Sequence, residues 1–150
     1  LVKYHENPGR MVFLTPDPEI DDHQIALTVG REGSAKLIGH IAWKVDTPAD
    51  VKDFYERLKS LGVPIDHCVS HAYEVMGNTV SCYFLDPEGN RVEIYAHTPW
   101  HVSQPYGKDL DLSEPVAVIH DKTLAMIRDD PSFAPREQWA AALRARIDAA

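Results

Sequence analysis

The 150-residue sequence has only two cysteines, Cys68 and Cys82, and their spacing matches no metal-binding or redox motif. A secreted scaffold held together by disulfides usually carries more cysteines, so we expect a reducing environment. No run approaches the roughly 18 apolar residues of a membrane span, and the first ten residues lack a charged-then-apolar signal pattern. We therefore expect a cytoplasmic protein with no membrane partner.

Basic residues are also scarce, because 15 Lys and Arg stand against 23 Asp and Glu and give a net charge of -8. Clustered basic side chains are what hold a phosphate backbone, so the composition argues against a nucleic-acid partner. The hydrophobic content of 44% fits one globular domain with a sizeable core.

Short β-type runs separated by turn signals dominate the first hundred residues. The pattern predicts strands over 1–5, 10–15, 23–29 and 38–45, and again over 67–75, 78–84 and 91–96. Between these groups the period changes from two to 3.6, which predicts an amphipathic helix. Thr47 as N-cap, Pro48 as first helical residue and Gly62 as the stop bound it, and its apolar positions are Val51, Phe54, Tyr55, Leu58 and Leu61.

The order of elements over residues 38–96 is therefore strand, helix and three strands, a complete βαβββ module. Residues 1–37 have the pattern of three strands of a second copy, whose opening strand and helix are not in this chain. Residues 97–150 comprise an irregular, Pro-rich segment followed by helical sequence. The last helix, over 135–150, carries Trp139, Leu143 and Ile147 on one stripe, and we expect it to dock on the domain or on a partner subunit.

Two chemically distinctive side chains lie in the outer strands of the complete module. Side chains alternate along a strand, so His40 shares a face with Ala42 and Lys44, while Ile41, Trp43 and Val45 are expected to form the core under the helix. By the same alternation Val92 and Ile94 face the helix and Glu93 faces away from it. His40 and Glu93 can thus converge in one cupped sheet, where they would be two of the three ligands of a 2-His-1-carboxylate Fe(II) site. The plain alternative is a structural histidine and a solvated glutamate.

The runs "GHIAWKVD", "FYERLKSLGV" and "YFLDPEGNRVEIY" together resemble the vicinal oxygen chelate superfamily of glyoxalases, bleomycin-resistance proteins and extradiol dioxygenases. The resemblance is strong over residues 38–96 and looser over 1–37. Within the superfamily, the sequence is most similar to type I ring-cleaving dioxygenases of the catechol 2,3-dioxygenase type. The resemblance implies an α+β fold of paired βαβββ modules, the first incomplete, with a C-terminal helical extension.

The same resemblance implies roles for individual residues. "HQIALT" is similar to the strand that supplies a second-sphere acid–base histidine, which gives His23 that role. "DHCVSH" resembles the stretch that brings another histidine to the pocket, here His71 with His67 as the substitute. Tyr83, ten residues before Glu93, matches the active-site tyrosine. His40 and Glu93 are then metal ligands.

The family takes its first metal histidine from the opening strand of the first module, which this chain lacks. His5 is a poor substitute, so either the third ligand lies upstream of Leu1, or a partner chain supplies it, or the chain binds no metal. His97 and His101 are spaced as a helical metal pair, but Pro99 between them disfavours a helix. The exposed sheet edge left by the missing strand favours pairing with another chain, so we expect a homo-oligomer.

The function that the resemblance implies is extradiol cleavage, in which O2 is inserted into a small catechol-like aromatic at a mononuclear Fe(II) site. Mn, Ni, Zn and Co are the alternative metals. Two other functions stay open: a glyoxalase-like, metal-dependent lyase or isomerase, and a non-catalytic module that binds a small molecule.

Overall fold

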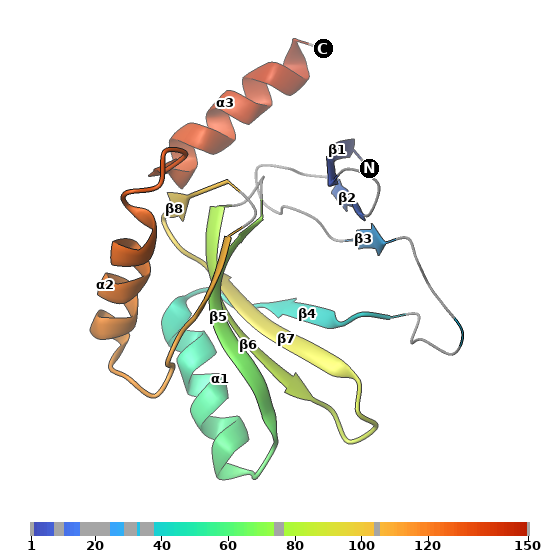
Figure 1. The fold of residues 1–150 in the computed structure, drawn as a ribbon, viewed down its shortest axis with the longest axis vertical. Helices are drawn as coiled ribbons and strands as arrows, with labels where there is room; N and C mark the ends of the chain where they lie inside the picture. The colour runs from blue at the N-terminus through green and yellow to red at the C-terminus, as the bar shows by residue number, and fades with distance from the viewer. Residues whose placement is uncertain are drawn as a thin grey trace.

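The computed structural model describes residues 2–7, 11–15, 25–28, 33, 38–73, 77–103 and 106–149. Its centre is a five-stranded sheet with the order β4-β7-β6-β5-β9 (Figure 1). β4 runs parallel to β7, and the other neighbours are antiparallel. The strands are β4 (Ile41–Lys44), β5 (Ile65–Tyr73), β6 (Gly77–Leu85), β7 (Arg91–His97) and β9 (Tyr106–Asp109).

The helix α1 (Pro48–Ser60) connects β4 to β5, and its ends agree with the sequence signals. At its start the backbone N–H of Asp50 donates to Thr47 Oγ1 (3.2 Å), and the N–H of Thr47 donates to Asp50 Oδ2 (2.8 Å). This reciprocal capping box satisfies two donors that a helix would otherwise leave free. Just past the end, Gly62 adopts a φ of +72°, a left-handed conformation that glycine adopts without strain.

The core lies on one face of the five-stranded sheet, under α1 and α2 (Val116–Ile127). Side chains alternate along strands, so even-numbered residues of β6 and β7 fill this core and odd-numbered ones face the other way. The opposite face is therefore free to carry polar groups. The buried residues of this core are Val51, Val80, Cys82, Ile94, Ala96, Leu110, Leu112 and Ile119.

The sequence predicts that Ile41, Trp43 and Val45 form part of the core, and this prediction is wrong for Ile41 and Trp43. Ile41 is 47% exposed and Trp43 is 62% exposed, and only Val45 packs against the core. β4 is an edge strand, and α1 packs mainly over β7, β6 and β5. The helix therefore leaves the apolar side of this edge uncovered.

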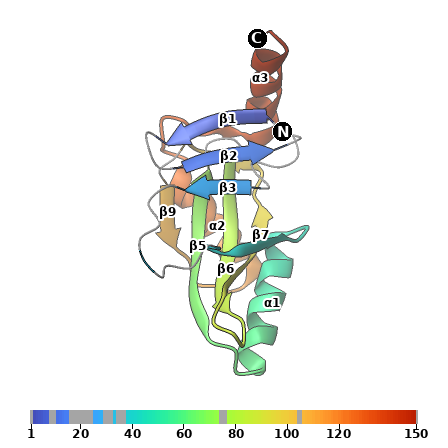
Figure 2. The ribbon, with the colours of Figure 1, turned by 90° about the vertical axis from the view of Figure 1, so that its right-hand side faces the viewer.

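A second, antiparallel sheet is formed by β1 (Val2–Asn7), β2 (Met11–Thr15) and β3 (Ile25–Thr28), in that order (Figure 2). These strands lie where the sequence predicts them. β2 and β3 are shorter than predicted, and β1 ends two residues later. Their up-and-down order repeats that of β5, β6 and β7 in the larger sheet. The predicted α+β fold class is confirmed.

The region after Ala96 is more regular than the sequence indicates. β8 (Trp100–His101) pairs with β10 (Ala134–Pro135), and β9 extends the large sheet beyond β5. α3 (Arg136–Asp148) follows and projects from the body of the molecule (Figure 1). Its Trp139 ring stacks on His101, with ring centroids 4.3 Å apart. Among the described residues, no helix combines the length and apolar character needed to cross a bilayer.

The stacked His101 is also nearly inaccessible, at 1% exposure. Burial lowers the pKa of His101 to about 4, although the nearby Asp130 carboxylate partly opposes this. In the unfolded chain a histidine takes up its proton near pH 6.5. The neutral ring is therefore part of the packing between β8 and α3.

We predict that Thr47→Ala lowers the free energy of unfolding by about 1 kcal/mol, because it removes the N-cap acceptor. Urea denaturation followed by circular dichroism measures the change. Thr47→Ser keeps the hydroxyl and serves as the matched control. Equal stability of the alanine and serine variants would contradict this role for the cap.

We also predict that the folded state loses stability as the pH falls from about 6.5 to 4. In this window the unfolded chain binds a proton at His101 that the folded chain does not bind. The stabilisation of the folded state that results from the low pKa of His101 is complete above pH 6.5, amounts to at most about 3 kcal/mol, and is lost as the pH falls to 4. The variant His101→Phe keeps an aromatic ring but cannot titrate. Denaturation at several pH values should give a smaller loss for this variant than for the wild type, and parallel curves would argue against His101 as the source.

Candidate functional site

Glu93 is the centre of the polar face of the sheet. Its side chain is 6% exposed, and each carboxylate oxygen faces one imidazole. Oε2 lies 3.3 Å from Nε2 of His40, and Oε1 lies 3.3 Å from Nε2 of His71. His40 directly precedes β4, His71 is on β5 and Glu93 is on β7, so three segments far apart in the sequence meet at one carboxylate.

The carboxylate is held in its ionised form. Burial alone raises the pKa of Glu93, but hydrogen bonds from His40, His71 and Ser81, together with the attraction to His71, outweigh it. The net result is a pKa well below the usual range. A charged oxygen donor is therefore present at neutral pH, as metal ligation requires.

The spacing of His40 and Glu93 fits two donors that share one ion. Donors that bind a metal at about 2.1 Å and at right angles lie roughly 3 Å apart, close to the 3.3 Å between His40 Nε2 and Glu93 Oε2. In the described part of the chain, no group of three or more His, Cys, Asp or Glu is arranged to hold a metal ion. These two residues thus offer part of a ligand set and not a complete one.

Ser81 is a residue of this site that the sequence analysis missed. Its hydroxyl is fully buried on β6 and lies 2.8 Å from Nε2 of His71. The Ser81 hydroxyl is also among the groups that lower the pKa of Glu93, and since a carboxylate can only accept, the hydroxyl is the donor toward Glu93. The signal in the sequence is its position two residues before Tyr83, which puts both on one face of the strand.

Aromatic rings form the wall next to the carboxylate. The Tyr83 ring is stacked on His67, with centroids 4.4 Å apart and an interplanar angle of 9°. The centroid of the Tyr83 ring lies 5.7 Å from that of His40, which it meets edge-on, and 6.3 Å from that of His71, to which it is tilted. Tyr83 is 6% exposed, while the His67 side chain is 40% exposed and leaves a flat ring accessible.

The structure thus brings together four of the five residues predicted from the sequence, His40, His71, Tyr83 and Glu93. Of the two alternatives on β5, His71 contacts the carboxylate and His67 contacts Tyr83, so both lie on the same side of the strand. His23 lies outside the described residues. The catalytic and metal-binding roles of all five stay predictions.

The family model described as Glyoxalase/Bleomycin resistance protein/Dioxygenase superfamily matches residues 2–94 of the chain. This match covers more than half of the sequence, and the βαβββ order of the large sheet agrees with it. The chain belongs to this superfamily.

Among curated proteins, the chain is 37% identical over 94 residues to biphenyl-2,3-diol 1,2-dioxygenase 2 of Rhodococcus globerulus. The matched region covers 56% of this chain and 44% of that protein. It is 29% identical over 90 residues to the manganese-dependent 2,3-dihydroxybiphenyl 1,2-dioxygenase of Geobacillus genomosp. 3, covering 60% of this chain and 27% of the relative. The chain therefore spans less than half the length of these curated relatives.

The solved structures to which the chain is similar include a lactoylglutathione lyase from Agrobacterium tumefaciens, at 24% identity and a TM-score of 0.33, covering 63% of this chain and 73% of the other. A glyoxalase/bleomycin resistance protein/dioxygenase from Alicyclobacillus acidocaldarius has 15% identity and a TM-score of 0.35, with coverage of 63% and 71%.

We predict that Ser81→Ala lowers the free energy of unfolding by about 1–2 kcal/mol, because His71 and Glu93 lose a buried partner. In metal-free protein the ring signals of His71 should shift in its NMR spectrum. Thr98→Val is the matched control, since it removes a different buried hydroxyl bond, to the Asn78 carbonyl. Unchanged ring signals in Ser81→Ala would show that Ser81 does not orient His71.

Proposed function

We propose that this chain is part of an extradiol ring-cleaving dioxygenase that inserts O2 into a catechol-like aromatic diol at an Fe(II) site. The observation that carries the proposal is the approach of His40 and Glu93 to within 3.3 Å on the polar face of the sheet. The names of the curated relatives support the reaction class, and their low coverage keeps it a proposal.

His40 and Glu93 would hold the metal, together with a histidine supplied upstream of Leu1 or by a partner chain. When bound, the iron supplies the electronic pathway by which O2 reacts with the aromatic ring, which the side chains alone do not provide. Manganese is the first alternative metal, since one relative is named as manganese-dependent.

The side chains around the carboxylate suit an aromatic substrate. The exposed ring of His67, backed by Tyr83, offers a flat surface for stacking an aromatic ring. Ring cleavage also needs protons to be moved, and an imidazole can accept and release one near neutral pH. We assign that role to His71 on this side of the pocket and to His23 beyond the described residues.

Tyr83 contributes a phenol next to the imidazole of His40. A phenol both donates and accepts hydrogen bonds, so it can orient a diol oxygen and shield it from water. The fully buried hydroxyl of Ser81 fixes His71 against Glu93 at the back of the site. The chain therefore supplies orientation, proton transfer and exclusion of water.

The test is an assay of the full-length protein, loaded with Fe(II), on 2,3-dihydroxybiphenyl. We expect a yellow ring-cleavage product and consumption of one O2 per diol. His40→Ala and Glu93→Gln should lower the activity by at least about 100-fold, because loss of a ligand costs no less than loss of an outer-sphere partner. The amount of iron bound per chain should fall together with the activity in both variants.

Matched controls are His120→Ala and Glu88→Gln, which change an exposed histidine on α2 and an exposed glutamate in the β6–β7 turn. Both should keep wild-type activity. Turnover of a hemithioacetal without O2 consumption would favour a lyase instead. Tight binding of the diol that EDTA does not change, with no turnover, would favour a binding module.

A further inference from the structure

Cys68 and Cys82 lie directly opposite each other on the neighbouring strands β5 and β6. Both thiols are free. Opposed residues in antiparallel strands have Cα atoms about 4.5–5.5 Å apart, and disulfides join Cα atoms separated by about 4.4–6.8 Å. The backbone is thus already spaced for a bond between the two sulfurs.

The hairpin fixes this pairing. The register is unbroken from the His67–Tyr83 pair to the Tyr73–Gly77 pair, and the irregularity lies outside this range, between Ile65 and His67. A shift by one residue would move the buried side chains of β6 to the polar face of the sheet. The two cysteines therefore stay opposite each other for as long as the sheet is folded.

The two sulfurs already interact. A hydrogen bond between them raises the pKa of Cys68 and lowers the pKa of Cys82. The charge of a singly ionised pair therefore lies mainly on Cys82, while Cys68 keeps its proton. The ionised Cys82 can take up this proton when Cys68 reacts, which leaves Cys68 as the thiolate that attacks an oxidant.

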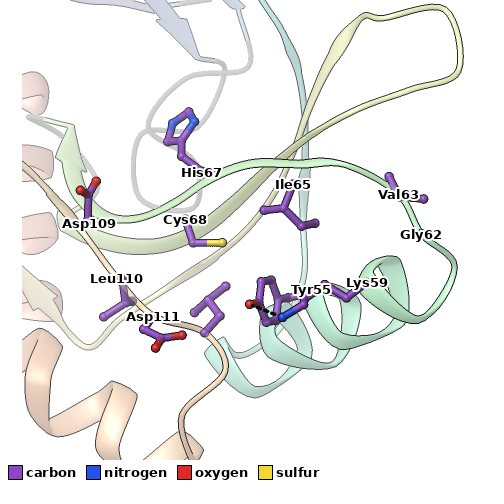
Figure 3. A pocket seen from close by; sticks show the side chains of 11 residues that line it. Tyr55, Lys59, Gly62, Val63, Ile65, His67, Cys68, Asp109, Leu110 and Asp111 are labelled. Atoms are coloured by element: carbon purple, nitrogen blue, oxygen red, sulfur yellow. Dashed lines mark hydrogen bonds between the residues drawn. The ribbon is translucent and has the colours of Figure 1, made fainter.

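Access to the pair is one-sided. Cys82 is fully buried in the core, whereas Cys68 is half-buried and lines a groove of about 650 Å³ (Figure 3). The groove runs between α1, β5 and the segment that follows β9, with Tyr55 and Leu110 among its lining residues. A small oxidant can therefore reach Cys68 but not Cys82.

We propose that Cys68 and Cys82 are a peroxide-responsive dithiol that closes to an intrachain disulfide. The Cys68 sulfur attacks one oxygen of a hydroperoxide as its proton passes to the ionised Cys82. The O–O bond breaks, Cys68 becomes a sulfenic acid, and the departing oxygen takes a proton from solvent and leaves as water or an alcohol. The Cys82 sulfur then attacks the Cys68 sulfur, and the second oxygen leaves as water. Two thiols are oxidised by two electrons, and one peroxide is reduced.

The disulfide would lie immediately behind the candidate site. The Cys68–Cys82 pair stands between the His67–Tyr83 pair and the Val69–Ser81 pair along the hairpin. Side chains of these neighbours point to the opposite face, where Tyr83 stacks on His67 and Ser81 holds His71. Closing the bond should therefore change the environment of both histidine rings.

The experiment uses reduced, metal-free protein in EDTA, so it does not depend on the proposed reaction. Hydrogen peroxide is added, and intact mass is measured after blocking of the remaining thiols. We expect a monomer lighter by two hydrogen atoms, a peptide linking Cys68 to Cys82, and full reversal by dithiothreitol. The NMR signals of the His67 and His71 rings should shift on oxidation.

Two single variants test the order of events. Cys82→Ser should stop at a sulfenic acid on Cys68 that dimedone traps, because the second thiol is missing. Cys68→Ser should react at least about tenfold more slowly, since the remaining thiol is buried. Equal rates for the two variants would overturn the assignment of Cys68 as the attacking sulfur.

Wild-type protein that keeps two alkylatable thiols at peroxide levels that oxidise free glutathione would overturn the proposal. A disulfide found only between two chains would also overturn it. Histidine signals that stay unchanged while the intrachain disulfide forms would remove the link to the candidate site.

Discussion

The burial of one ionised carboxylate is the constraint on which the site depends. An isolated charge inside a protein is costly, so the side chain of Glu93 requires partners that donate hydrogen bonds. His40, His71 and Ser81 supply them from three different segments. The same strands bury Val80, Cys82 and Ile94 on their other face. Core and polar site are therefore the two sides of one sheet, and the packing of α1 and α2 on one side fixes the geometry on the other.

Much of this arrangement follows from local patterns. The change of period and the signals at Thr47 and Gly62 predict α1, and alternation places His40 and Glu93 on one face. Alternation assigns faces but does not say which faces are covered, and this is why Ile41 and Trp43 were predicted as core and are exposed. The pairing of β9 with β5 depends on contacts between distant segments and has no local signal.

The finer parts of the site depend on strand register, which single-strand patterns do not contain. The stacking of His67 on Tyr83 and the contact of His71 with Ser81 both require the β5–β6 hairpin to close at one particular pairing. The opposition of Cys68 and Cys82 has the same origin. Their separation of fourteen positions matches no motif, yet the hairpin makes them neighbours. Register thus decides which chemistry the alternating faces bring together.

The two oxygens of Glu93 differ in their surroundings, and this difference sets the direction of approach. Oε1 faces His71, whose side chain is 9% exposed, and Ser81 closes that side. Oε2 faces His40, whose side chain is 36% exposed at the start of the edge strand β4. Within the described residues, the side of His40 is therefore the more open of these two approaches to the carboxylate. The exposed apolar residues Ile41 and Trp43 follow directly along that edge. Alternation along β4 turns Ile41 and Trp43 to the opposite face from His40, so this edge presents an imidazole on the side of the carboxylate and apolar side chains on the side of α1.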